Sequence, residues 1–375
     1  MTNWRSITRM ILKATLLFAV CNVLFALLNP IEALGSISLY NFIVPGRERL
    51  PYGEDSARSY NLSLYNIPAM INSHVLARPK AADEFRVVII GDSATWGWFL
   101  KNENTLAGQI NAQGLKTADG KRIVAYNLGY PIMALTKDLL ILDEALKHQP
   151  DLIIWPMTLE SFPREKQIFA PIVQNNADRV RRLIDTYQLN LDRTDARFAS
   201  VDFWGKTIIE QRRALADWLR LQLYGFSWAA TGIDQYIPDQ IKLRQSDFEA
   251  DLSWQSFKQP TTLTDADLAF DVLAAGVKMA ENEPVLIINE PMFISAGKNS
   301  DLRYNSFYPR WAYDQYHMLL NQQTQANGWH YLDVWDAIAP ENFTDTPVHL
   351  NPAGSAQYAQ LVGAQILSLS RQRSK

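Results

Sequence analysis

The sequence predicts an α/β fold with a parallel, flavodoxin-like sheet, and two observations carry this prediction. Short apolar, β-branched runs alternate with segments of helical periodicity on both sides of an irregular middle region. The first of these runs, residues 87–90, stops abruptly at Gly91, and Asp92 and Ser93 follow it. Because open parallel sheets bind ligands at the carboxyl ends of their strands, this turn also indicates where a functional site would lie.

The expected elements follow one another along the chain in a regular alternation. The apolar runs that predict strands are 87–90, 123–128, 151–155, 284–289 and 329–334. The segments that predict helices are 105–111, 137–146, 265–280, 313–325 and 354–369. Strands that alternate with helices imply parallel pairing with helices on both faces, so we expect a three-layer sandwich.

A region from 161 to 260 interrupts this alternation. Two stretches in it, 176–191 and 203–224, have helical spacing and many arginines, and the apolar segment 225–232 is expected to be a loop. The sequence leaves two interpretations open: a helical hairpin buried on the main domain, or a lid or partner-docking element over the site. We therefore expect one domain over 85–375 that contains a helical insertion at 161–260.

The N-terminal stretch predicts a membrane anchor. Residues 10–28 are almost wholly apolar, follow Arg5 and Arg9, and at ~1.5 Å per residue are just long enough to cross a bilayer core. The preceding arginines predict a cytoplasmic N-terminus and an exported remainder, so the protein would be single-pass. A cleaved signal peptide is the competing interpretation, but no clear small-x-small cleavage site follows. We expect the N-terminus and transmembrane helix at 1–30 and a juxtamembrane lead-in at 31–84.

Composition excludes several classes of protein. A net charge of -3 gives no general attraction to nucleic acid. The single cysteine, Cys21, lies in the apolar N-terminal stretch, so the folded part has no disulfide and no cysteine-based metal site. We expect neither a metal nor a cofactor. An aromatic content of 11% suits a core and also a surface that faces carbohydrate or lipid.

Ser93 would need a base, an orienting carboxylate and oxyanion donors to act as an acyl-transfer nucleophile. Of five histidines, only His349 lies in a loop after the last strand and directly before a helix, where it could face Ser93. Asp345 is on the same loop and could accept a hydrogen bond from the ring, with Glu290 and Asp336 as alternative carboxylates. The competing interpretation is structural, because such residues also cap helices and stabilise loops.

These motifs resemble the SGNH, or GDSL-type, hydrolase superfamily. Gly91-Asp92-Ser93 stands near the start, and an aspartate followed by His-Leu-Asn-Pro-x-Gly stands near the end. The resemblance covers roughly 85–160 and 284–369. It implies that Ser93 is the nucleophile and His349 the base, and that the backbone N–H groups of Ser93 and of Gly129, in Asn-Leu-Gly, hold the oxyanion.

The sequence departs from the pattern of that superfamily at two places. Its aspartate usually lies three residues before the histidine, whereas here Thr346 has that position and Asp345 is one residue further away. We keep Asp345 as the orienting acid because Pro347 alters the path of the loop. The asparagine of the third block is also missing, and Thr158 could donate from its hydroxyl in its place. Loss of one such donor typically costs ~100- to 1000-fold in rate, which implies a slow, specialised or partner-dependent site.

An anchored and exported domain of this kind is similar to membrane-tethered SGNH proteins that move acyl groups on bacterial envelope polymers beside a multi-span acyltransferase. The resemblance implies an extracytoplasmic serine esterase or O-acyltransferase that acts on short acyl esters, including those of cell-envelope glycans, with a multi-span membrane acyltransferase as its partner. The alternative is a catalytically degenerate member that binds a glycan, or a structural subunit of a membrane complex. The missing third-block asparagine favours this alternative, and Ser93 with His349 argues against it.

Overall fold

The centre of the molecule is a parallel sheet. The computed structural model describes residues 4–44, 46–53, 63–199, 201–233, 237–281 and 283–373. The five strands are β1 (Glu84–Gly91), β2 (Arg122–Gly129), β3 (Leu152–Met157), β4 (Val285–Asn289) and β5 (His330–Asp333). They pair in the order β2-β1-β3-β4-β5, and every pair is parallel. This is the flavodoxin-like order, so the predicted fold class is confirmed.

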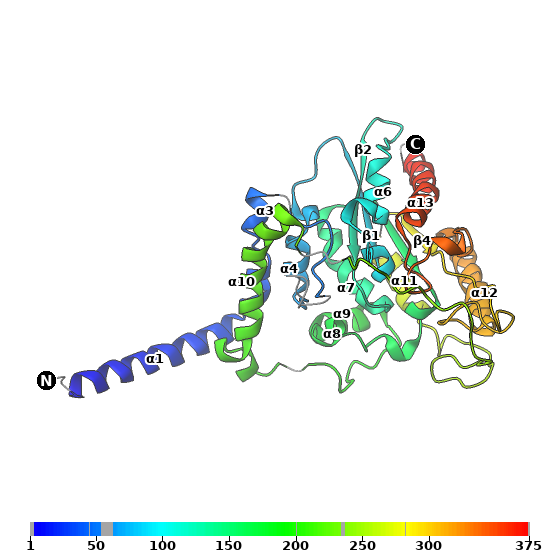
Figure 1. The fold of residues 1–375 in the computed structure, drawn as a ribbon. Coiled ribbons are helices and arrows are strands. Elements are labelled where there is room, and N and C mark those ends of the chain that lie inside the picture. Colours follow the sequence, from blue (N-terminus) through cyan, green and yellow to red (C-terminus); the bar gives the residue numbers. More distant parts are fainter. Residues whose placement is uncertain are drawn as a thin grey trace.

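Helices cover both faces of this sheet (Figure 1). The helices of the main domain are α4 (Ile67–Asn72), α5 (Ser93–Trp96), α6 (Leu106–Ala112), α7 (Leu135–Ala145), α11 (Phe270–Met279), α12 (Arg310–Asn327) and α13 (Pro352–Arg373). Short 3₁₀ turns lie at Val75–Ala77, Asn102–Asn104, Leu146–His148, Leu159–Ser161, Arg164–Lys166, Trp204–Lys206 and Pro340–Asn342. Apolar residues of α6 and α13 belong to one core cluster, and those of α7, α11 and α12 belong to the other. The molecule is therefore the expected three-layer sandwich.

Strand β1 separates the two core clusters, and all of its residues are buried. Val88 and Ile90 pack in the cluster with α7, whereas Val87 and Ile89 pack in the cluster with α6 and α13. Because successive side chains of a strand point to opposite faces, an apolar run of this kind has to be covered on both sides. This is why the run before Ser93 is a central strand and not an edge.

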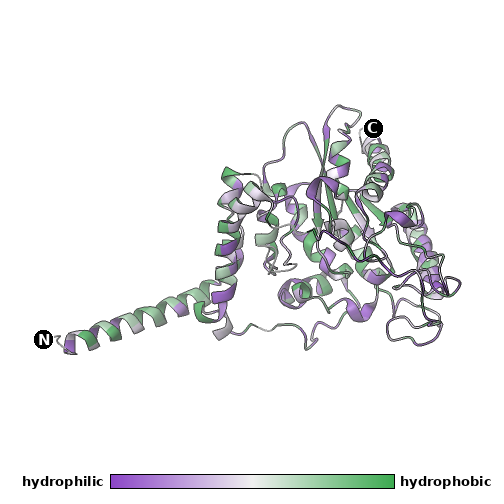
Figure 2. Cartoon of the chain, in the orientation of Figure 1, coloured by the Kyte–Doolittle hydropathy of each residue, from purple (hydrophilic) through white to green (hydrophobic). Residues whose placement is uncertain are grey.

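The N-terminal helix α1 (Trp4–Leu28) projects from the body of the molecule (Figure 1). Its residues are predominantly hydrophobic along almost its whole length (Figure 2), and most of them are exposed. By length and composition it is the one helix in the described part of the chain that could cross a membrane, and a signal sequence would have the same features.

The lead-in after α1 packs closely on the domain. It contains α2 (Ile31–Gly35), α3 (Tyr40–Ile43) and α4, and Leu50, Met70 and Ile71 are fully buried in the core cluster beside α7. In its described residues, 31–44, 46–53 and 63–84, the segment is therefore an integral part of the fold rather than a free tether.

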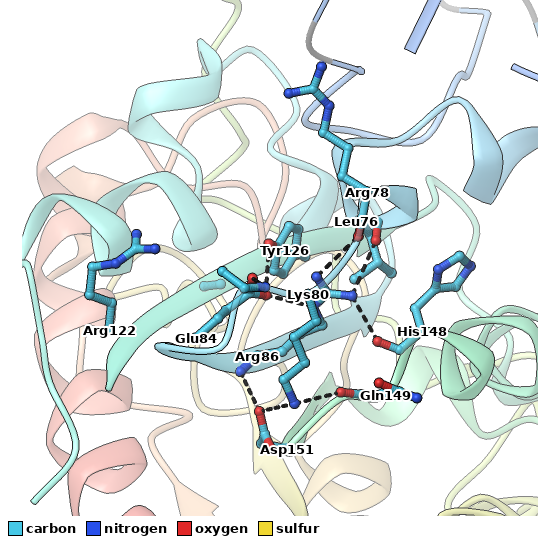
Figure 3. A network of polar contacts seen from close by, with 12 residues as sticks. Leu76, Arg78, Lys80, Glu84, Arg86, Arg122, Tyr126, His148, Gln149 and Asp151 are labelled. Atoms are coloured by element: carbon cyan, nitrogen blue, oxygen red, sulfur yellow. Dashed lines mark hydrogen bonds and ion pairs between the residues drawn. The ribbon is translucent and has the colours of Figure 1, made fainter. Parts of the chain in front are cut away.

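A buried polar network at the amino end of β1 joins the lead-in to the sheet (Figure 3). The Arg86 guanidinium contacts Glu84 at 2.6 Å and donates to the carbonyl of His148 at 2.8 Å. Asp151 accepts from the Arg86 N–H and from Lys80, both at 2.6 Å. Removing one partner of a buried ion pair typically costs ~3–5 kcal/mol, so this end of the sheet depends on the network. It lies at the opposite end of β1 from Ser93.

In its described residues, 161–199, 201–233 and 237–260, the insertion contains the α-helices α8 (Pro171–Gln174), α9 (Ala177–Tyr187) and α10 (Ile208–Thr231). The first two bury apolar residues in the core cluster beside α7. Helix α10 adds Leu221 and Trp228 to the same cluster and also packs against α1, α2 and α3. The predicted loop at 225–232 is wrong, because α10 continues to Thr231. Gly225 lies where a Cβ would come within 2.4 Å of the Tyr40 ring, so this glycine serves close packing and does not end the helix.

Candidate active site

The structure brings Ser93, His349 and Asp345 together, although Ser93 and His349 are 256 positions apart in the sequence. The Nε2 atom of His349 lies 2.8 Å from the Oγ atom of Ser93. Its Nδ1 atom lies 2.9 Å from Oδ1 of Asp345. In this geometry the ring can accept the serine proton at Nε2 while its Nδ1–H donates to the carboxylate.

Ser93 is presented by a sharp turn between β1 and α5. Gly91 has φ +152°, and a Cβ at this position would lie 2.4 Å from Oγ1 of Thr95. The carboxylate of Asp92 accepts the N–H of Ala94 at 2.8 Å, so Asp92 caps α5, as the structural interpretation expects. Asp92, and not Ser93, caps the N-terminus of α5. The hydroxyl of Ser93, the first residue of α5, points to His349.

His349 is held in place on its ring face and at its backbone. The Trp98 ring stacks on the imidazole with centroids 5.9 Å apart and planes inclined by 21°. The His349 carbonyl accepts from the Thr344 N–H at 2.8 Å, and its own N–H donates to the Thr346 hydroxyl at 3.2 Å. The residue is 6% exposed. The ring is therefore fixed before any substrate binds.

The one-residue shift of the aspartate is accommodated by the loop from Thr344 to His349. Phe343 and Leu350 form an antiparallel bridge that closes the loop, and the Thr344 hydroxyl donates to Asp345 at 3.1 Å. Burial raises the pKa of Asp345, but the hydrogen bond and charge of His349 outweigh it, so this pKa lies below its ordinary value. Asp345 is thus a carboxylate at neutral pH. The alternative acid Asp336 is exposed.

An arginine from the end of the insertion supports this loop. The Arg244 guanidinium donates to the carbonyls of Phe343 and Pro340, and its backbone N–H donates to the Thr344 carbonyl at 3.0 Å. The guanidinium also lies over the Phe293 ring, 4.1 Å from its centroid. Sequence reasoning missed Arg244, because a single arginine in an irregular segment carries no motif.

The structure does not support Gly129 as an oxyanion donor. Its N–H donates to Oδ1 of Asn127 at 3.0 Å, and the amide of Asn127 in turn donates to the Trp96 carbonyl at 3.2 Å. A Cβ at position 129 would lie 2.4 Å from the backbone nitrogen of Trp96. Gly129 is therefore needed for the close approach of β2 to the α5 turn, and its N–H is already occupied.

Thr158 has the same difficulty, because it is fully buried and its hydroxyl donates to the Tyr308 hydroxyl at 3.1 Å. Of the three predicted donors, the Ser93 N–H is left. As the first N–H of α5, it has no acceptor within that helix.

A cluster of buried ionisable residues, Asp92, Lys137, Asp138 and Glu290, lies beside the Ser93 turn. The Lys137 ammonium donates to the Gly91 carbonyl at 2.6 Å and pairs with Asp138, whose second oxygen accepts from the Trp155 indole at 3.1 Å. Lys137 thereby holds the residue at which β1 ends. The sequence indicated none of this, because Lys137 and Asp138 were predicted only as the first two residues of a helix.

Burial is the main influence on the carboxyls of this cluster. It raises the pKa of Asp138 to about 6 and that of Asp92 above its ordinary value, in each case against the opposing effect of Lys137. Burial and the neighbouring Asp92 and Asp138 raise the pKa of Glu290 well above its ordinary value. Glu290, named from the sequence as an alternative orienting acid, belongs to this cluster, and the acid that contacts His349 is Asp345.

Within the residues that the structure describes, no group of three or more histidine, cysteine, aspartate or glutamate side chains could hold a metal ion. The arrangement of Ser93, His349 and Asp345 can perform nucleophilic chemistry.

Comparison with known proteins gives structural likeness only. No protein-family model and no curated protein matches the sequence. The fold is similar to a lipase/acylhydrolase from Enterococcus faecalis, with 13% identity, 76% of this chain and 96% of that chain covered, and a TM-score of 0.36. It is also similar to a carbohydrate acetylesterase family member from Sinorhizobium meliloti (12%, 76% and 99%, 0.33) and to a member of the lipolytic protein G-D-S-L family from Veillonella parvula (9%, 76% and 98%, 0.36).

At these identities and TM-scores, the structural similarities do not define the class of this protein. Strand order and side-chain geometry define the class of protein: a flavodoxin-like α/β protein with a hydrogen-bonded Ser-His-Asp triad at the carboxyl edge of its sheet.

Proposed function

We propose that this chain is a serine esterase or O-acyltransferase of the SGNH type, anchored by α1 with its α/β domain on the extracytoplasmic side. The observation that carries the proposal is the continuous hydrogen-bonded chain from Asp345 through His349 to Ser93, at 2.9 and 2.8 Å. The resemblance of its motifs to SGNH proteins supports short acyl esters, including esters of envelope glycans, as substrates.

The triad geometry supports a two-step acyl-transfer reaction through an acyl-enzyme. The Ser93 oxygen attacks the ester carbonyl while Nε2 of His349 takes the hydroxyl proton. When the tetrahedral intermediate collapses, the same nitrogen returns the proton to the leaving alkoxide, and the acyl group stays on Ser93. Water or a sugar hydroxyl then attacks this acyl-enzyme while His349 again accepts the proton. When the second tetrahedral intermediate collapses, the bond between the acyl carbon and Oγ of Ser93 breaks, and His349 returns the proton to the serine oxygen. Asp345 keeps Nδ1–H in place and stabilises the imidazolium.

The small number of hydrogen-bond donors left for the oxyanion supports slow ester hydrolysis. Gly129 and Thr158 already use their donors within the protein. Because one missing donor typically costs ~100- to 1000-fold in rate, we expect slow turnover of small esters by the isolated chain. A multi-span membrane acyltransferase that supplies the acyl group and completes the site would be a suitable partner.

The proposal is tested with the detergent-extracted full chain and a short-chain aryl acetate. We expect measurable turnover by the natural protein, and none above background by Ser93→Ala or His349→Ala. The matched control is Ser306→Ala, which changes an exposed serine and should leave turnover unaltered. Equal hydrolysis by the natural protein and both triad variants would refute the assignment.

A degenerate or structural subunit is the second candidate, and the occupied donors of Gly129 and Thr158 favour it. It predicts a folded chain without turnover that is retained in purified membranes with a stoichiometric partner, or that binds a glycan. Absence of turnover together with such a partner would establish this candidate in place of the first.

A further inference from the structure

Helix α10 carries an exposed apolar stripe. Leu219, Leu223 and Phe226 are 53%, 69% and 40% exposed. Their spacing of four and three residues places them on one face of the helix. The opposite face is packed, because Leu221 and Trp228 are buried. The stripe is therefore an outward-facing surface that the domain itself does not cover.

The lead-in extends this apolar area. On and beside α3, Leu39, Phe42 and Ile43 are 59%, 93% and 74% exposed. The Leu39 N–H donates to Oε1 of Gln222 at 2.7 Å, so α3 is tied directly to α10. We call Leu39, Phe42, Ile43, Leu219, Leu223 and Phe226 together the α3–α10 surface.

Helix α1 is joined to the same part of the molecule. The Asn22 side chain accepts the N–H of Ile209, in the first turn of α10, at 3.3 Å, and Asn22 and Ala26 are the buried residues of α1. Figure 1 shows α1 leaving the body on the side where α10 lies, with α10 running past the inner end of α1 towards α3. A membrane crossed by α1 would therefore meet α10 along its length.

The residues that flank the stripe suit a lipid headgroup region. Arg212, Arg213 and Arg220 are exposed along α10, and Trp204, just before the helix, is 67% exposed. Arginines attract anionic headgroups, and tryptophans concentrate at the membrane interface. An apolar stripe with basic neighbours is typical of helices that lie in the interface plane, with the apolar face ~5–10 Å deep.

We propose that the α3–α10 surface lies on the outer face of the membrane in which α1 is anchored and inserts its apolar side chains at the boundary between headgroups and acyl chains. This inference rests on the anchor of the proposed function. Its consequence is that the α/β domain has a fixed orientation and Ser93 a fixed height above the bilayer. A lipid surface is the occupant we infer, because the apolar area continues directly from α1 and has basic residues beside it.

The test is lipid quenching of a fluorophore on the full chain in nanodiscs of anionic phospholipid, with one protein per disc. Cys21 is exposed on α1, and a label there reports the anchor itself. In a Cys21→Ser background, a label at Leu223→Cys reports the α3–α10 surface. A label at Met318→Cys, 51% exposed on the distant helix α12, is the matched control.

With lipids brominated in the upper acyl chain, we expect the label at position 223 to lose most of its emission and the label at 318 to lose none. Aqueous iodide should give the reverse order. If the label at 21 is quenched by lipid while 223 behaves like 318, the anchor stands and the surface proposal is overturned. If neither 21 nor 223 is quenched, the anchor fails as well.

Other occupants would give different results, and each overturns the proposal. A second copy of the chain would make the label at 223 self-quench in discs loaded with two labelled copies, without lipid quenching. A membrane protein partner would shield the label from iodide in native membranes and not in discs. Aryl acetate turnover equal to that of the unlabelled chain shows in each case that the labelled variant is folded.

Discussion

At the scale of single residues, the orientation of His349 depends on Asp345. We predict that Asp345→Asn lowers kcat for aryl acetate by ~10⁴-fold without unfolding the protein, because an amide that donates to Nδ1 favours the wrong imidazole tautomer. The control is Asp336→Asn, which changes the exposed alternative acid and should keep full activity. Loss of activity in Asp336→Asn but not in Asp345→Asn would show that Asp336, and not Asp345, orients His349.

Glu290 provides a prediction about stability and pH. Its pKa lies well above its ordinary value in the folded protein, so folding takes up a proton at any pH between the two values. The contribution of Glu290 to stability is therefore highest below the ordinary pKa of 4.5 and falls by up to about 1.4 kcal/mol per pH unit as the pH rises towards the folded pKa.

Glu290→Gln has no proton to take up, so we expect it to be more stable than the natural chain at pH 8 and to lose this advantage towards pH 4.5. Urea unfolding followed by tryptophan fluorescence measures the difference, with the exposed Glu341→Gln as control. If the free energy of unfolding depends on pH in the same way in Glu290→Gln and in the natural protein, Glu290 is ionised in the folded protein and the prediction is wrong.

The sequence predicted that Ser93, His349 and Asp345 lie together, because few residue types can form such a triad, and the structure has them within hydrogen-bond distance. Their catalytic roles stay predictions. The sequence could not show that Asn127 takes the N–H of Gly129 or that Tyr308 takes the hydroxyl of Thr158. These acceptors depend on packing between segments that are distant in the sequence or on the local path of the backbone.

At the scale of elements, the end of the insertion positions the loop that carries Asp345 and His349. Arg244 binds the backbone on the N-terminal side of Asp345. We predict that Arg244→Gln lowers kcat by up to ~100-fold, because a displacement of about 1 Å at the reacting groups is enough for such a loss. KM should change little. The control Arg193→Gln alters an arginine whose side chain is 56% exposed and should be silent; a normal kcat in Arg244→Gln would show that the loop holds itself.

The predicted strands and helices agree with the structure because their periodicity is strong. The strand expected at 87–90, for example, is the buried centre of Glu84–Gly91. Arg86 interrupts the apolar run before Val87, and Gly91 ends it, so the apolar pattern alone does not give the full length of the strand. The predicted end of helix α10, just before Gly225, is too early. Glycine is frequent in turns, but here its missing side chain leaves room for the Tyr40 ring, and no local sequence pattern reveals this contact with the lead-in.

At the scale of the whole molecule, α1 either stays as an anchor or is removed as a signal sequence. We predict that the protein extracted from membranes has its N-terminal residues, because Asn22 and Ala26 are buried against the domain and the Asn22 side chain accepts from α10. Intact mass measurement after alkaline washing of the membranes decides this. A soluble chain whose mass begins after residue 30 would show that α1 is cleaved.

The layered architecture could be predicted from the sequence because alternating strands and helices allow few parallel topologies. The place of the insertion could not. Its first helices join the core beside α7, α10 packs on this core and on α1 and α3, and residues near Arg244 join the His349 loop. Tertiary contacts decide where each part of the insertion packs, and the helical spacing of the sequence alone does not predict these contacts.

The central claim is that His349 activates Ser93 as a nucleophile, and covalent labelling tests it most directly. The folded, membrane-extracted chain is treated with a fluorophosphonate, and the modified peptide is located by mass spectrometry. We predict a single adduct on Ser93, abolished in Ser93→Ala and strongly slowed in His349→Ala. A folded natural chain that stays unlabelled, or one labelled on another serine, would contradict the claim.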